Sequence, residues 1–141
     1  MNLNIDCIRD VLIYCADNIN VEKTTVGKWN LKYVSLHSLY QSDLKDNYSE
    51  KEIMYSVSKL YECGFIEIRN RVPKQSIYME SCHIVDVTFR GHQFLESIKE
   101  PSSWEKTKSI AKSVGNYTLN FIEDTAQKIA VAATTALIAK I

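Results

Sequence analysis

The 141-residue chain contains little glycine and little proline, with four residues of the first kind and two of the second. Flexible linkers and low-complexity tracts depend on these residues, so we expect a chain that is ordered over most of its length. It also has no excess of either charge, because 17 basic residues balance 17 acidic ones. A neutral chain has no general positive field to draw it onto nucleic acid, so any DNA binding must depend on local patches.

Cysteines are few and widely spaced, at Cys7, Cys15, Cys63 and Cys82. No Cys-x-x-Cys pair is present, which argues against a structural zinc site and gives no disulfide framework. We therefore expect reduced thiols and a cytoplasmic protein, since the N-terminus also lacks the features of a secretion signal. The longest uncharged apolar run, residues 129–139, would extend about 17 Å as a helix. A hydrocarbon core is about 30 Å thick, so we expect no membrane span.

Signals of catalysis are also missing. His37, His83 and His92 fall in different expected elements and have no metal-ligand spacing. Nothing resembles a phosphate-binding loop, a nucleophile elbow or a pair of catalytic carboxylates. We predict a non-enzymatic protein with no catalytic residue, no metal site and no cofactor.

The most informative stretch begins at Ser49, which forms a predicted capping box with Glu52. Apolar residues then recur at helical spacing, and Gly64 supplies the left-handed residue that ends a helix. Residues 65–69 alternate as a strand does, and a polar, cationic connector follows from Arg69 to Lys74. A return strand at 83–87 completes a hairpin whose connector we interpret as a wing.

The preceding segment supplies the other elements of this fold. We predict a first amphipathic helix over residues 4–19 and a half-buried strand within 24–34, where Trp29, Leu31 and Tyr33 alternate with polar residues. Ser35 then caps a second helix. The order helix, strand, helix, helix, strand, wing, strand is that of the winged-helix variant of the helix-turn-helix. The predicted fold class is therefore α+β, with a small antiparallel sheet.

We divide the chain into a winged-helix domain at 1–100 and a helical extension at 101–141. Ser102 and Glu105 form a second predicted capping box, and Gly115 ends the helix that it opens. The last helix, about 117–140, carries an apolar stripe. Its members are Leu119, Ile122, Ala126, Ile129, Ala133 and Leu137. The stripe lies beyond a complete core, which favours self-association, and the alternative is that the helix folds back on its own domain.

Several segments resemble one family. They are 87–99 with 104–108, the opening at 6–12 and the junction at 61–66. Together they resemble a family of small phage and prophage proteins known as domain of unknown function twenty-five thirteen. Phe89 stands where this family has tryptophan, and Lys99-Glu100 replaces arginine and aspartate. The resemblance implies an origin in a bacterial mobile element or its host, and it carries over no functional residue.

The winged-helix hypothesis predicts which side chains meet double-stranded DNA. Bases would meet Lys51, Tyr55, Ser58 and Lys59 on the recognition helix, and phosphates would meet Arg69, Arg71 and Lys74 of the wing. We therefore predict DNA binding in transcriptional or mobile-element regulation, by a homo-oligomer joined through the last helix. The alternative is a protein-interaction module, an adaptor or inhibitor of a host or defence protein. Its surface would be formed by Tyr33, Tyr40, Tyr48, Tyr55 and Tyr61.

Overall fold

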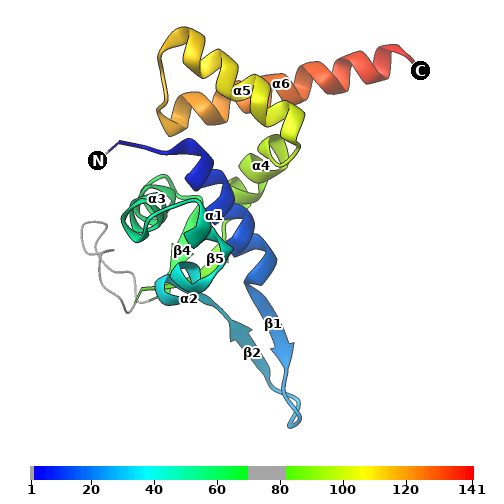
Figure 1. Ribbon diagram of the computed structural model, residues 1–141. Coiled ribbons are helices and arrows are strands. Elements are labelled where there is room, and N and C mark those ends of the chain that lie inside the picture. Colours follow the sequence, from blue (N-terminus) through cyan, green and yellow to red (C-terminus); the bar gives the residue numbers. More distant parts are fainter. Residues whose placement is uncertain (1, 70–81) are drawn as a thin grey trace. The chain divides into compact units, whose positions relative to one another are not determined.

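The computed structural model describes residues 2–69 and 82–141 (Figure 1). Its fold class is α+β, as predicted, and the chain forms two compact units, Met1–His92 and Gln93–Ile141. The first unit contains α1 (Ile5–Asn18), β1 (Asn20–Lys23), β2 (Trp29–Lys32), β3 (Val34–Ser35), α2 (Leu36–Gln41), a 3-10 turn (Asp43–Asp46), α3 (Glu50–Glu62), β4 (Ile66–Ile68) and β5 (His83–Val87). The units divide within α4 (Phe89–Ile98), which is followed by α5 (Pro101–Val114) and α6 (Leu119–Ala139).

The core of the first unit lies where α1 packs against α3 and β5. Apolar residues spaced three and four apart place one face of each helix inward. The fully buried side chains include Ile8, Leu12, Ile53, Leu60, Phe65 and Ile84. This core holds α3 in a fixed position, with its other face toward solvent.

The predicted helix boundaries of α2 and α3 are confirmed by their caps. Ser49 Oγ accepts from the Glu52 amide at 3.1 Å, and the Glu52 carboxylate accepts from the Ser49 amide at 3.2 Å. Ser35 makes the corresponding cap at the start of α2. Gly64 follows α3 with a φ of 78°, a left-handed conformation that costs glycine little. Local sequence chemistry therefore fixes both ends of α3.

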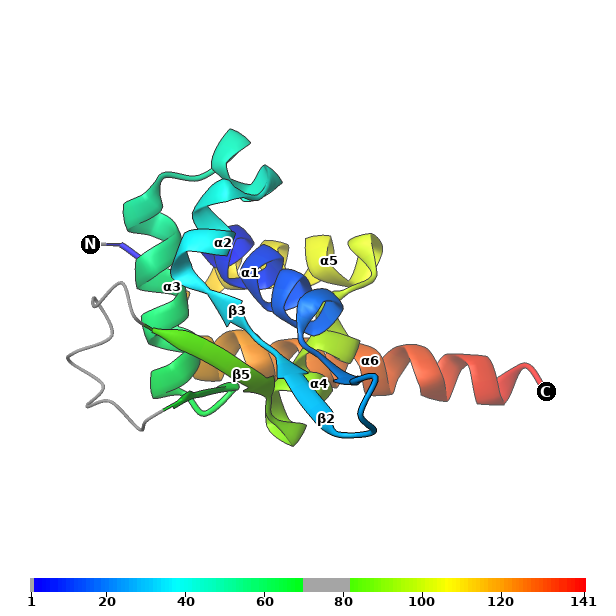
Figure 2. The same cartoon turned by 90° about the horizontal axis from the view of Figure 1, so that it is seen from below.

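Three strands form an antiparallel sheet in the order β3-β5-β4. Figure 2 shows β2 leading into β3, which lies beside β5. The start of α4 approaches this sheet closely, because a Cβ at Gly91 would lie 2.1 Å from the Phe65 carbonyl oxygen. Thr88 Oγ1 accepts from the Gly91 amide at 3.0 Å, so Thr88 caps the start of α4. The sheet and α4 thus meet at a position that only glycine fills.

The strand predicted within 24–34 is confirmed as β2, but the prediction that it is half-buried is wrong. β2 pairs with β1 in a separate two-stranded hairpin whose eight strand residues are all exposed. The third strand of the main sheet is instead the short β3. Alternation of polar and apolar residues predicts a strand with one apolar face, but it does not predict whether other residues cover that face.

In the second unit, α5 and α6 pack against each other. The predicted capping box at Ser102 and Glu105 is wrong, because α5 begins at Pro101 and has Glu100 as its N-cap. Proline suits the first helical position, where its missing amide costs nothing. Gly115 ends α5 with a φ of 76°, as predicted. None of the helices described is long and apolar enough to cross a membrane.

Candidate nucleic-acid interface

The exposed face of α3 carries only part of the predicted base-contacting set. Lys51 is exposed, and Tyr55 and Lys59 are half-buried at the edge of the helix. Ser58 differs from the prediction of a solvent-facing side chain, because it is only 5 % exposed. At 3.6 residues per turn it lies on the same side of α3 as Lys51 and Glu62, away from the core residue Ile53, so helical spacing alone could not predict its burial. Ser58 is therefore removed from the candidate interface.

Lys59 is held within α3 by two neighbours. Its Nζ lies 2.8 Å from Glu62 Oε2 and 5.2 Å from the centre of the Tyr55 ring. Exposed pairs of this kind contribute about 0–1 kcal/mol, so a phosphate or another partner can replace Glu62 at small cost. Lys51 lies two turns earlier and extends the cationic edge of the helix.

The carboxylate of Glu52 has a structural role at the start of α3. Asn4 Nδ2 donates to Glu52 Oε2 at 2.8 Å, and the Ser49 amide donates to Oε1. Hydrogen bonds from Asn4 and then from Ser49 lower the pKa of this carboxyl group below its ordinary value. The carboxylate is thus occupied as a cap and as a link to the residue that caps α1.

Arg69 lies at the end of β4, where the predicted wing begins. Its guanidinium carbon is 4.8 Å from the centre of the Tyr33 ring. Tyr33 in turn stacks on His83, with ring centres 4.2 Å apart and planes inclined by 27°. This stack joins Arg69, the first residue of the predicted wing, to Tyr33 at the base of the β1–β2 hairpin and to His83 of β5. Arg71 and Lys74, the other predicted wing contacts, lie outside the described residues.

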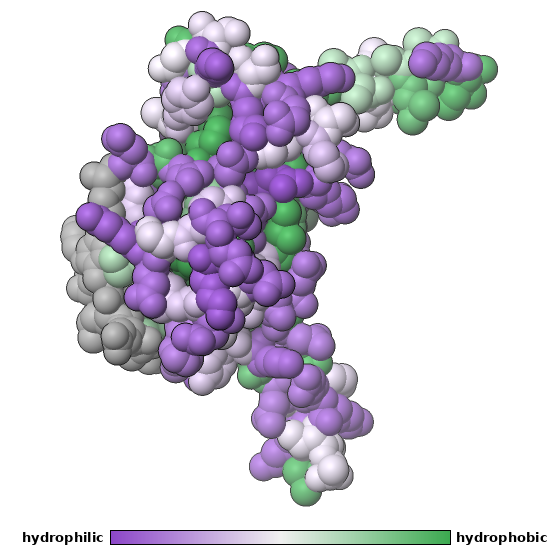
Figure 3. All heavy atoms as spheres, viewed as in Figure 1, coloured by the Kyte–Doolittle hydropathy of each residue, from purple (hydrophilic) through white to green (hydrophobic). Residues whose placement is uncertain are grey.

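The β1–β2 hairpin carries exposed cations that were not among the predicted DNA contacts. Lys23, Lys28 and Lys32 are exposed, together with Trp29. The sequence does show lysines on both sides of Trp29, but the same alternation of polar and apolar residues is typical of a half-buried strand. Figure 3 shows hydrophilic spheres along this hairpin and a hydrophobic group at its tip.

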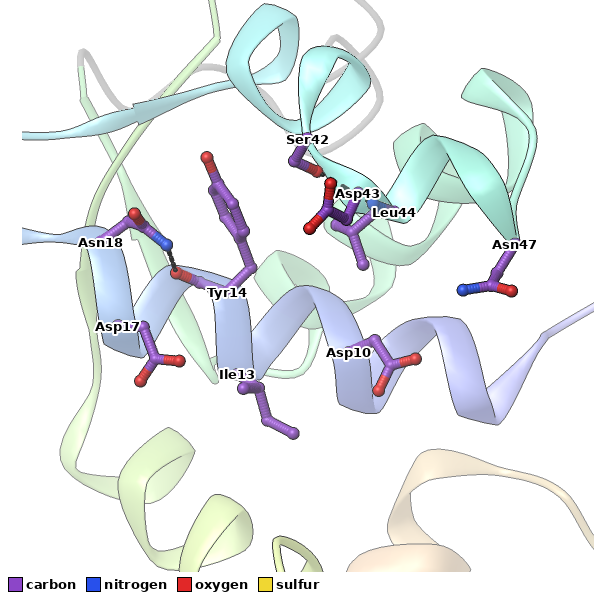
Figure 4. A pocket seen from close by; sticks show the side chains of 9 residues that line it. All are labelled: Asp10, Ile13, Tyr14, Asp17, Asn18, Ser42, Asp43, Leu44 and Asn47. Atoms are coloured by element: carbon purple, nitrogen blue, oxygen red, sulfur yellow. Dashed lines mark hydrogen bonds between the residues drawn. The ribbon is translucent and has the colours of Figure 1, made fainter.

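A groove of about 290 Å³ on the opposite side of α1 from its core is acidic (Figure 4). It is lined by Asp10, Asp17 and Asp43, with Tyr14 and Asn18 at one end. The Tyr48 hydroxyl donates to Asp10 at 2.6 Å. Burial is the largest cause that raises the pKa of Tyr48, and this hydrogen bond is the second. Carboxylates repel phosphates, so this groove lies outside the candidate interface.

The described part of the chain holds no cluster of His, Cys, Asp or Glu that fits a metal ion.

Three of the four cysteines have a pKa shifted away from the reactive thiolate form. Burial raises the pKa of Cys7 and Cys82 to about 11 and that of Cys15 to about 12. A nucleophilic cysteine needs the opposite shift, because the thiolate is the reactive form. All four thiols are free, and only Cys63 is partly accessible.

The predicted oligomerisation stripe on α6 divides into two halves. Leu119, Ile122 and Ala126 are buried within the unit that contains α5 and α6. Ile129 is half-buried, and Ala133 and Leu137 are exposed. The first half therefore folds back, which was the alternative prediction, and only the second half is open to another chain.

These elements define a small α+β protein in which a capped helix pair is followed by strands of an antiparallel sheet. Residues 2–117 match the family model described as Hypothetical protein (DUF2513), and the chain belongs to that family. The family membership inferred from the sequence is thereby confirmed. No curated protein and no solved structure matches the chain.

Proposed function

We propose that this protein binds double-stranded DNA as a winged-helix regulator of a phage, a prophage or a related bacterial element. The observation that carries the proposal is the order of elements: the helix pair α2–α3 leads into β4 and β5, which pair in the sheet β3-β5-β4. This is the order in which winged helices place a recognition helix beside a hairpin. Free cysteines fit the reducing cytosol in which we place the protein.

In this proposal α3 enters the major groove with Lys51, Tyr55 and Lys59 toward the bases. Arg69 contacts a phosphate, and Arg71 and Lys74 are the other two proposed phosphate contacts. Three phosphate contacts give a salt slope of about −2.7, hence about a 40-fold loss of affinity between 50 and 200 mM salt. One copy therefore binds weakly.

Self-association through the end of α6 compensates for this weakness. From Ile129 to Ala139 the helix has no charged residue, yet most of these residues are exposed in a single chain. Apart from Thr134 and Thr135 the side chains of this segment are apolar, and a helix with apolar residues around most of its surface is normally covered. A second copy would cover it and would double the number of DNA contacts.

The proposal is tested by fluorescence anisotropy with a labelled 30-base-pair duplex of random sequence. The wild type and the Arg69→Ala, Arg71→Ala, Lys74→Ala variant are titrated at several salt concentrations. We expect the slope of log affinity against log salt to be shallower by about 2.7 in the variant. Identical slopes would remove the wing from the interface.

Protein binding is the second candidate function, and the α3 surface favours it in one respect. Its exposed face mixes Lys51 with Glu50 and Glu62, and Lys59 already pairs with a carboxylate. Of the five tyrosines near the helix pair, four are half-buried and Tyr33 is exposed. Such a mixed rim suits an adaptor or inhibitor of a host protein. If the protein does not bind duplex DNA even at 50 mM salt, the result would favour protein binding.

A further inference from the structure

The β1–β2 hairpin is built differently from the rest of its unit. Its strands pair only with each other among the described residues, and Trp29 is 68 % exposed. A two-stranded hairpin is marginally stable alone in water. At its base a cleft of about 510 Å³, lined by Val21, Leu31 and Val85, separates it from β5. The apolar side of the ribbon is therefore not part of the core.

Positive charge is concentrated on this hairpin. Residues 20–33 contain three lysines and one glutamate. The other described residues of the same unit contain six basic and ten acidic side chains. Within the described chain, neither Lys28 nor Lys32 is ion-paired. The hairpin is thus a cationic arm on an otherwise acidic unit, which fits a polyanionic partner.

The lysines lie on both faces of the ribbon. Lys23 is directly opposite Trp29 in the register and lies over its ring at 5.9 Å. Lys32 is opposite Asn20 and belongs to the other face, and so does Lys28 by alternation. A ribbon that enters a groove of DNA edge-on has a phosphate backbone beside each face, whereas one lying flat on a surface needs cations on one face only. The major groove is about 12 Å wide and admits a two-stranded ribbon.

The base of the arm is anchored to the candidate interface. Tyr33 follows β2 directly, stacks on His83 of β5 and carries the guanidinium of Arg69. The arm therefore leaves the sheet beside the residue from which the predicted wing leaves. A ligand bound at Arg69 therefore lies close to the base of the arm.

We infer that residues 20–32 form a second DNA-contacting arm that inserts into a groove, with Lys23, Lys28 and Lys32 on phosphates and Trp29 against the groove wall. This inference rests on the proposed function. It assigns DNA contacts to the hairpin in addition to those proposed for α3 and the wing.

The test compares two triple variants on the same labelled 30-base-pair duplex. Lys23→Gln, Lys28→Gln, Lys32→Gln removes the arm's charge, and Lys106→Gln, Lys112→Gln, Lys140→Gln removes three exposed lysines of the other unit. Both change the net charge equally. We expect the salt slope to become shallower by about 2.7 in the arm variant and to change by less than about 0.5 in the control.

Trp29 gives an independent readout, because Trp104, the other tryptophan, is buried. Acrylamide quenching of wild-type fluorescence should fall on addition of the duplex, and Trp29→Phe should abolish that change. If the wild type binds DNA but both triple variants have its slope and Trp29 stays quenchable, the arm is overturned while the proposed function stands. If the wild type binds no DNA, both are overturned. If the two triple variants lose affinity equally, the effect is net charge and the arm is overturned.

Discussion

The exposed end of α6 gives the sharpest prediction about assembly. Val131, Leu137 and Ile138 are 65 %, 65 % and 62 % exposed in a single chain. Full burial of such a side chain contributes about 1.5–3 kcal/mol, so covering two thirds of it contributes about 1–2 kcal/mol. Six such side chains in a twofold dimer give about 6–12 kcal/mol before the cost of association. Replacing all three by glutamine removes most of this energy.

We expect the Val131→Gln, Leu137→Gln, Ile138→Gln variant to be a monomer where the wild type is an oligomer. Even a loss of about 3 kcal/mol weakens the dissociation constant more than 100-fold, because about 1.4 kcal/mol corresponds to a factor of ten. Light scattering coupled to size exclusion, over a wide range of protein concentrations, measures this. A control is Ser109→Gln, Ser113→Gln, which changes exposed polar residues of α5 outside that segment.

The substitutions are confined to the last turns for a structural reason. Truncation after Gly115 also reduces the apolar stripe, but it removes Leu119, Ile122 and Ala126 from the core of their unit. Ile122→Ala should lower the free energy of unfolding by about 2–5 kcal/mol and leave the assembly intact if the chain folds. A wild type with the monomer mass of 16.2 kDa at every concentration would refute the assembly hypothesis.

Three further predictions concern the fold. Gly91→Ala should destabilise the protein by about 1–3 kcal/mol or more in urea unfolding, because the new Cβ would lie 2.1 Å from the Phe65 carbonyl oxygen; unchanged stability would contradict this packing. Glu52 has a pKa below its ordinary value of 4.5, so its ionised form stabilises the fold above that pH and loses its effect as pH falls through the folded-state pKa. The stability difference between wild type and Glu52→Gln should therefore be largest near neutrality and shrink in acid, and a constant difference would argue against the cap. Native thiol titration should show one fast cysteine that Cys63→Ser removes, because burial raises the pKa of the other three; three or more fast thiols would contradict the burial.

Local chemistry in the sequence was enough to predict the helix ends. The boxes at Ser35 and Ser49 and the stop at Gly64 each depend on a few neighbouring residues, so the structure confirms them. The box at Ser102 failed for a similar local reason, since α5 begins at Pro101, two positions earlier than a cap at Ser102 would allow, and Glu100 is the cap. Capping is predictable where one residue alone can fill the position.

Burial was harder to predict, because it depends on contacts distant in sequence. Trp29 and Leu31 alternate as core residues would, yet they lie on an exposed hairpin. Ser58 is polar and yet buried. For the same reason the sequence located Lys51 and Lys59 on an accessible edge of α3 but missed the lysines of the hairpin. Whether those lysines are free to contact a ligand depends on how the hairpin packs against the rest of the chain.

The central claim, DNA binding by α3 and its neighbouring arms, is tested most directly by lysine footprinting. The protein is acetylated briefly with and without a 30-base-pair duplex, and the modification of each lysine is quantified by mass spectrometry. We predict that Lys51 and Lys59 become protected in the complex while Lys106 and Lys112, on α5, react at their free rate. Equal reactivity of Lys51 with and without saturating duplex, or protection confined to α5, would contradict the claim.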